Sequence, residues 1–457
     1  MAHIEIKKGL DIPIKGKPEG KIQTLTPKKS PKQIALNLDP FEDIRFKLLA
    51  KRGDGIKIGQ PLVEDKLAEG RVFASPAAGV ITDIRRGLKR RLINIVIDVD
   101  KDEAYHEIAP LDAENASAAE IIDKLKAGGI FAHIRCRPFN RLAMPDKLPR
   151  SIFVKAIESA PFTPPAELQV EGYEEEFQEG LAALSKLTSG PVHLVYHKNT
   201  TCRAFTEAKN VQKHTATGPH PIGNFSIHIQ HLDPITTAED MIWTVTAHDV
   251  VTIGHLLKTG RYLVDRVISI AGAGILPEHV GYYKVRAGYP IEELAANHLL
   301  KGPIRLISGD PLMGLKVEPE DFLHFYHYVF CAIPESVGRE FLSFLRLGLK
   351  KFSFSKTFPS GHLSHDSRKY DFTTNLNGEP RAFVDGSLYD KVMPLNISTM
   401  ALVKAVMAKD YELAEELGLL EVDSEDFALP TFVCPSKMEM TEIIRHGLKK
   451  QAAELLE

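Results

Sequence analysis

The sequence predicts a multidomain α/β protein. Short strands fill residues 1–100, strands alternate with helices over 101–260, and amphipathic helices occupy the C-terminal part. The 457 residues suffice for about three or four domains, and 44% hydrophobic with 26% charged residues is typical of a globular protein. No apolar run approaches the roughly 18–20 residues of a membrane-spanning helix, and no signal-peptide core is visible. We therefore expect a soluble, cytoplasmic chain.

Residues 1–100 are expected to form a compact sandwich of short strands. Apolar and polar residues alternate at 52–63, 72–84 and, most regularly, 92–99. The turns Gly59-Gln60-Pro61-Leu62 and Ser75-Pro76 to Gly79 resemble those of the biotinyl/lipoyl carrier fold, the barrel-sandwich hybrid. Carriers of that family present a modified lysine on a tight hairpin. Lys66 follows an acidic pair, but its register differs from that of the carriers, so a lipoyl-type carrier is the alternative rather than the leading function.

Residues 101–260 are expected to form a Rossmann-like domain with a parallel sheet, because strands and helices alternate there. The first helix has Ser117 as its N-cap and Glu120 three residues later, which is a capping box. The further predicted elements are a strand at 151–157, a helix at 174–187, a strand at 192–196 and a helical run at 245–257.

Two smaller domains follow. Residues 261–330 are expected to be β-grasp-like, with strands at 267–272, 282–286 and 304–309 and a helix at 290–296. One more strand, expected at 325–333, starts the C-terminal part. Residues 331–457 are expected to be mostly helical, with one helix over 399–417 and another over 436–455, the latter capped by Ser436.

Charge is unevenly distributed, which suggests a docking surface. Residues 1–100 carry 20 lysines and arginines against 13 acidic residues, although the whole chain has a net charge of −3. The densest basic cluster, which we call the basic tip, consists of Arg85, Arg86, Lys89, Arg90 and Arg91. It fits a solvated hairpin or a contact with anionic lipid or an acidic partner. Nucleic acid is not expected, because no aromatic residues interleave with these cations.

Other motifs point to no catalytic centre. Gly272 and Gly274 fit a turn that ends a strand better than a dinucleotide fingerprint. Histidines 214, 220, 228 and 231 crowd one segment, but in a strand His228 and His231 would face opposite sides and could not share a metal. Four scattered cysteines fit neither a disulfide framework nor a metal cluster, and Cys434 is expected to be a buried thiol. The loops 308–312 and 373–378 have turn chemistry that could bind a ligand.

Seven segments in order resemble one family, the NqrA subunits of the Na+-translocating NADH:quinone oxidoreductase. They are Lys7 to Ile14, Ser75 to Gly79, Arg137-Pro138-Phe139, Gly218-Pro219-His220-Pro221, Ile307-Ser308-Gly309, Lys391-Val392-Met393-Pro394 and Thr431 to Pro435. The resemblance implies a peripheral protein on the cytoplasmic face of the bacterial inner membrane. It also implies five partner subunits, some of them integral to the membrane, in a translocase that oxidises NADH, reduces ubiquinone and exports Na+. Contact with ubiquinone is implied for the complex and is possible for this chain.

The resemblance extends to the flavin-binding subunit of respiratory complex I and to the RnfC protein of the Rnf complex, but this sequence departs from their cofactor motifs. Their glycine-rich flavin loop corresponds to residues 128–139, where Ala132, Ile134, Arg135 and Arg137 replace glycines. Only Cys434 lies near the expected cluster ligands, and a [4Fe–4S] cluster takes four. We expect an accessory subunit that binds no cofactor or metal itself, within a complex that uses flavins, iron–sulfur, NADH and ubiquinone. A stand-alone flavin oxidoreductase is a further alternative.

Overall fold

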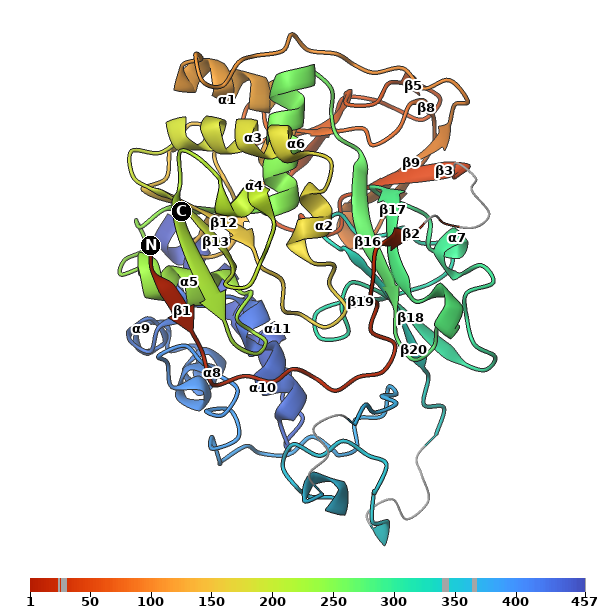
Figure 1. Ribbon diagram of the computed structural model, residues 1–457, viewed down its shortest axis with the longest axis vertical. Helices are drawn as coiled ribbons and strands as arrows, with labels where there is room; N and C mark the ends of the chain where they lie inside the picture. The colour runs from red at the N-terminus through yellow and green to blue at the C-terminus, as the bar shows by residue number, and fades with distance from the viewer. Residues whose placement is uncertain (24, 26–30, 339–344, 364–367, 457) are drawn as a thin grey trace.

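The computed structural model describes residues 1–23, 25, 31–338, 345–363 and 368–456. Figure 1 shows their arrangement, with the N-terminal sandwich and an α/β layer side by side and the C-terminal helices packed beneath the α/β layer. In each part, strands and helices pack their hydrophobic faces against one another to form a core. In the described residues no helix is both long and apolar enough to cross a bilayer.

Two small antiparallel sheets form the N-terminal sandwich. The first contains, in order, β3 (Gln33–Asn37), β9 (Leu92–Val99), β8 (Gly79–Arg86) and β5 (Gly55–Ile56). The second contains β4 (Phe46–Leu48), β6 (Pro61–Asp65) and β7 (Val72–Ala74). The alternation at 92–99 buries Ile95 and Ile97 between the sheets, as predicted. Two N-terminal strands, β1 (His3–Glu5) and β2 (Ile22–Gln23), do not belong to this sandwich, because each pairs with a strand of another sheet.

A seven-stranded sheet forms the second part, in the order β1-β14-β13-β12-β15-β10-β11. Its parallel strands are β1, β12 (Ser151–Ala156), β13 (Val192–His197), β14 (Gln212–Thr217) and β15 (Ile242–Thr246). An antiparallel hairpin of β10 (Arg135–Arg137) and β11 (Arg141–Leu142) extends one edge. The predicted parallel α/β sheet is confirmed, and the predicted helical run at 245–257 starts later because Val245 still belongs to β15.

Helices cover both faces of this sheet. They are α1 (Ala118–Ala127), α2 (Ala166–Val170), α3 (Glu174–Lys186), α4 (Arg203–Thr206), α5 (Phe225–Leu232) and α6 (Ala247–Thr259). Helices α1, α3 and α6 share one core, whereas α5 packs on the other face with the C-terminal helices. The predicted capping box of Ser117 and Glu120 is present at α1.

A mixed six-stranded sheet forms the third part, in the order β19-β18-β20-β16-β17-β2. Its further strands are β16 (Asp265–Ala271), β17 (Gly281–Arg286), β18 (Ile304–Ser308), β19 (Leu315–Val317) and β20 (Val329–Pro334), with α7 (Ile291–Ala295) between β17 and β18. The strand predicted at 325–333 begins only at Val329. Ile268 and Ile270 of this sheet share a core with Ile34 and Phe73 of the N-terminal sandwich.

The C-terminal part is less helical than predicted. Its main helices are α8 (Thr399–Ala408), α9 (Tyr411–Glu416), α10 (Ala428–Val433) and α11 (Met440–Leu456). The single helix predicted over 399–417 breaks at Lys409, which has a left-handed φ of 60°, and Asp410 caps α9. The helix predicted over 436–455 begins only at Met440, so Ser436 does not cap it, and the Ser436 hydroxyl donates to the carbonyl of Ala382. Irregular chain fills most of the described residues between β20 and α8.

Candidate functional site

The crevice where an open α/β sheet binds ligands is nearly closed here. The strand order reverses between β12 and β15, and ligands of such folds bind at the carboxyl ends of the strands flanking that point. Thr246, His248 and Tyr328 line a pocket of only about 20 Å³ there. Ligand pockets usually measure about 300–1,000 Å³, so this space is close to that of a single water molecule.

The helix N-terminus at this crevice is satisfied by the chain itself. Thr246 and Asp249 form a capping box on α6, and Asp249 also contacts Nδ1 of His133 at 3.1 Å. The other ring nitrogen of His133 bonds the Tyr262 hydroxyl at 2.8 Å. Burial acts to raise the pKa of Asp249, but the hydrogen bonds from His133 and Thr246 outweigh it and lower the pKa. A carboxylate therefore stands where a helix N-terminus would otherwise attract a phosphate.

The segment at 128–139 packs into the protein instead of forming an open loop. Ile130, Phe131 and Ile134 are fully buried in the α/β core, and residues 135–137 form the edge strand β10. Gly129, at a φ of 72°, lies against Ala74 of the sandwich, where a Cβ would come within 3.0 Å. The residues that replace glycines thus serve packing and sheet pairing.

A cluster of partly buried charged side chains lies beside the same crevice. Lys155 at the end of β12 forms an ion pair with Glu158 at 3.0 Å. Burial raises the pKa of Glu425 to about 8, against the opposing charge of Lys155. Burial also raises the pKa of Asp310. No sequence pattern brings these residues together, since they come from three separate parts of the chain.

A large cavity lies between the six-stranded sheet and α10, and we call it the aromatic cavity. Its volume is about 530 Å³. Phe352, Phe372 and Phe432 line it with ring centroids 5.6 to 5.9 Å apart. The loops 308–312 and 373–378, singled out by their turn chemistry, both contribute lining residues. Three segments that carry the family resemblance also reach it, through Ile12 and Ile14, Ile307, and Thr431 to Val433.

Polar groups stand at the wall of the aromatic cavity. The cations of Arg305 and Lys316 are paired with Glu335 at 2.6 Å and Glu318 at 2.8 Å. Lys437 has no carboxylate of a described residue within ion-pair distance, and burial lowers its pKa. The cavity therefore combines aromatic faces with a hydrogen-bond donor. The two loops were its signal in the sequence, whereas the phenylalanines at 352, 354 and 358 and Lys437 were not singled out there.

The structure separates the residues of the basic tip. Arg85 donates to the carbonyl of Glu320 and lies over the Phe322 ring, while Arg91 pairs with Asp39 at 2.5 Å. Arg86, Lys89 and Arg90 remain exposed, and Leu88 between them is 86% exposed.

Within the histidine-rich segment, His214 lies on strand β14, whereas His228 and His231, considered above as strand residues, lie on a helix. His228 and His231 lie on α5, three residues apart, and each bonds a backbone carbonyl, that of Ile222 or Ile227. Helical packing overrides the local pattern, because α5 buries its apolar face against β12 and the C-terminal helices. In the described parts of the chain no group of three histidine, cysteine or acidic side chains could hold a metal.

The structure also places the three remaining residues that the sequence analysis considered. Gly272 lies in the turn after β16, as predicted. Cys434 is a buried thiol, as predicted, with its sulfur 3.1 Å from the Tyr389 hydroxyl. Lys66 is exposed and is the first residue of the turn between β6 and β7.

Family models match most of the chain in three consecutive parts. An NqrA N-terminal barrel-sandwich hybrid domain matches residues 4–100, an NqrA second alpha/beta domain matches 116–262, and an NQRA C-terminal domain matches 267–318.

Full-length relatives agree with these matches. The chain is 36% identical to the NqrA subunit of the Na(+)-translocating NADH-quinone reductase of Chlamydia caviae, over 99% of this chain and 97% of the relative. It is also 36% identical to the protein of the same name from Tolumonas auensis, over 98% and 99%. A crystal structure of an NAD+-reducing [NiFe]-hydrogenase is similar with a TM-score of 0.38 and 13% identity, over 76% of this chain and 64% of that one, and nothing further rests on this likeness.

Proposed function

Because this chain belongs to the NqrA family of the Na(+)-translocating NADH-quinone reductase, we propose that it is the peripheral subunit of such a complex, on the cytoplasmic face of the bacterial inner membrane. It assembles with five other subunits, including integral-membrane ones, and supports quinone reduction coupled to Na+ export. The observation that carries this proposal is similarity over the full length of both chains rather than over one domain.

Co-purification tests the assignment. The chain is tagged at its native level, purified from detergent-solubilised membranes, and the eluate is assayed for Na+-stimulated NADH:quinone reductase activity. An untagged strain is the control. We expect activity and five co-eluting partners. Elution of the protein alone from the soluble fraction would contradict membership in a working complex.

The protein is further proposed to act without a redox centre of its own. Support comes from the closed crevice of about 20 Å³, from the Asp249 carboxylate at the start of α6, and from the packed segment at 128–139. The purified chain should show no flavin absorbance, and its intact mass should equal that of the unmodified sequence. A flavin spectrum would favour a stand-alone flavin oxidoreductase, and a lipoyl increment on Lys66 would favour a carrier.

The aromatic cavity is the proposed contact with quinone. A quinone is a flat ring with two carbonyl acceptors, and the cavity offers phenylalanine faces and the Lys437 ammonium, which pairs with no carboxylate of the described residues. A hydrogen bond from a charged donor contributes about 1.5–3 kcal/mol, so Lys437→Met should weaken binding of a short-chain ubiquinone about 10- to 150-fold.

Calorimetric titration of the isolated chain measures this effect, with Lys437→Arg as the conservative variant and Lys301→Gln, an exposed lysine that does not line the cavity, as the control. Lys437→Arg should keep most of the affinity because it still donates. Equal affinity of the wild type and Lys437→Met would remove the cavity as the quinone contact, while leaving the assignment to the complex intact.

A further inference from the structure

A second pocket, of about 310 Å³, opens where the N-terminal sandwich, the β10–β11 hairpin and the end of α11 meet. We call it the hairpin pocket. Its walls come from residues 40–44, the turn after β6, residues 135–142 and Leu456 of α11. It is separate from the aromatic cavity, with which it shares no lining residue.

The hairpin that forms one wall is fixed to the C-terminal part. Arg137 is buried and donates to the Ser226 hydroxyl at 3.0 Å and to the carbonyl of Glu421 at 3.1 Å. Asn140, in the turn, donates to the Asp423 carboxylate. The turn that contains Pro138 and Phe139 is therefore held in place, which gives the Arg137-Pro138-Phe139 segment a structural role.

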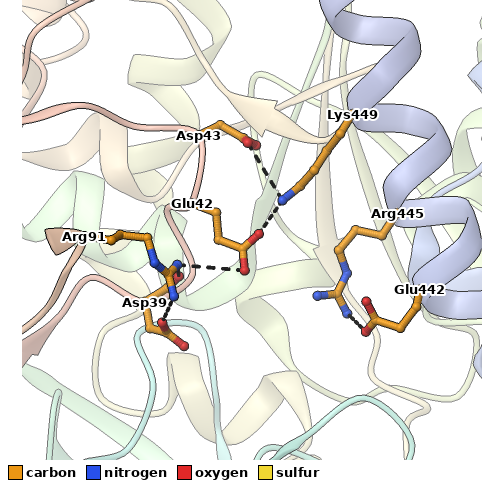
Figure 2. Close-up of polar contacts among 7 residues, drawn as sticks. All are labelled: Asp39, Glu42, Asp43, Arg91, Glu442, Arg445 and Lys449. Carbon is orange, nitrogen blue, oxygen red and sulfur yellow. Dashed lines mark hydrogen bonds and ion pairs between the residues drawn. The ribbon is translucent and has the colours of Figure 1, made fainter. Parts of the chain in front are cut away.

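The acidic groups of the hairpin pocket already have partners. Figure 2 shows Glu42 between Arg91 and Lys449, with Lys449 also reaching Asp43. Asp65, the third acid, is buried and pairs with Arg71. Each acidic charge in the wall is thus compensated by a cation of the same protein.

Besides Arg137, whose hydrogen bonds go to uncharged groups, three cations of the hairpin pocket have no carboxylate partner among the described residues. No carboxylate of a described residue lies within 4.0 Å of Arg135, Arg141 or Lys147. Arg135 stacks over the Tyr326 ring at 4.2 Å and donates one hydrogen bond to the carbonyl of Asn140, which leaves most of its donors unused. Arg141 and Lys147 are exposed. The pocket therefore has an excess of positive charge.

Apolar side chains form the floor and project from the rim. Phe41 and Met144 lie at the floor, and the rim leucines Leu67 and Leu456 are 64% and 53% exposed. The β8–β9 tip lies next to this rim, because Arg91 at its base reaches Glu42 on the pocket wall. Leu88 on that tip is 86% exposed beside Lys89 and Arg90. Three separate segments thus present exposed leucines in or beside the cationic pocket.

We propose that the hairpin pocket holds the phosphate of an acidic phospholipid, with Leu67, Leu456 and Leu88 inserted among the lipid tails. An anionic phosphate matches Arg135, Arg141 and Lys147, and leucines beside cations match the boundary between headgroups and acyl chains. A soluble anion would leave these leucines in water. The inference rests on the peripheral placement proposed above and assigns the lipid contact to named residues.

Vesicle co-sedimentation with the purified full-length chain tests this inference. We expect salt-sensitive binding to vesicles of phosphatidylcholine with phosphatidylglycerol, and much weaker binding to phosphatidylcholine alone. Each cation near an anionic surface changes affinity about fivefold, so Arg141→Gln with Lys147→Gln should weaken binding about 25-fold. Leu67→Gln should weaken it about tenfold, since leucine burial is lost.

Matched controls are Lys101→Gln, an exposed cation at the far end of β9, and Leu315→Gln, an exposed leucine of β19. Both should bind like the wild type, and all variants replace exposed side chains, so thermal melts should be unchanged. Binding that ignores vesicle charge, pocket variants that bind like the wild type, or equal competition by soluble glycerol phosphate would each overturn the proposal. Because the isolated chain is used, none of these results alters the co-purification test of the complex.

Discussion

The ion pair between Asp65 and Arg71 is buried at the junction between the sandwich and the β10–β11 hairpin, so removal of one partner should destabilise the protein. The two side chains are 1% and 5% exposed, and Arg71 Nε donates to Asp65 at 3.1 Å. Arg71 also donates to the carbonyl of Ala143 at 2.9 Å, beyond the end of β11. One guanidinium thus ties the turn after β6 to the α/β part.

Removal of one partner leaves an uncompensated buried charge. Asp65→Asn keeps the size of the side chain but leaves the Arg71 cation without its carboxylate, which costs about 3–5 kcal/mol in a buried site. For a cooperative unit of about 150–250 residues, 1 kcal/mol shifts the melting temperature by about 2–4 °C, so a fall of roughly 6–20 °C is expected. The double variant Asp65→Asn with Arg71→Met should recover much of this loss, because neither charge is then buried alone.

Urea denaturation and thermal melts at low and high salt measure the effect. The loss should persist at high salt, since a buried pair is hardly screened. Glu42→Gln is the control: its partner Lys449 is 35% exposed on its side chain, so this surface pair contributes at most about 1 kcal/mol and less at high salt. A wild-type urea midpoint for Asp65→Asn would refute the reasoning. So would a double variant whose loss of stability exceeds the sum of the two single losses.

Two further predictions concern packing and pH. A Cβ on Gly254 of α6 would lie 1.7 Å from the Glu176 carbonyl of α3, so Gly254→Ala should destabilise the protein by about 1–3 kcal/mol or more in urea denaturation. The control Gly55→Ala, which meets nothing within 4 Å, should stay within about 0.5 kcal/mol. Burial lowers the pKa of His228 and of His248 to about 3, so each stays neutral in the fold. Their contribution to the free energy of unfolding is complete above pH ~6.5 and is lost as pH falls toward 3. At pH ~5 each histidine has lost about 2 kcal/mol of this contribution. Burial raises the pKa of Glu425 to about 8, so this residue has the opposite effect and lowers the stability of the fold as pH rises above ~4.5. A urea midpoint that does not fall between neutral pH and pH ~5 would contradict the burial of the histidines.

The sequence alone determined the local elements and the family. The alternation at 92–99, the capping box of Ser117 and Glu120, and the strand at 151–157 depend on residues a few positions apart, and the structure contains all three. The seven ordered segments pointed to the family that the full-length relatives identify. Tertiary contacts decided the conformation around His228 and His231, which were considered only as strand residues, because packing of α5 against the sheet and the C-terminal helices makes this segment a helix.

Only the tertiary structure decided where ligands can bind. The aromatic cavity joins residues from Ile12 to Glu439, and the hairpin pocket joins residues from Pro40 to Leu456. No spacing in the sequence encodes such neighbours, because they meet only when separate layers bury their apolar faces against one another. The same holds for charge. The sequence gives no reason to distinguish the cations of the basic tip from one another. In the folded protein, however, Arg91 pairs with Asp39, whereas Lys89 and Arg90 stay exposed. Folding brings acidic residues that are distant in the sequence next to particular cations. Because charges interact strongly only at short distance, these contacts determine which cations remain available to a partner.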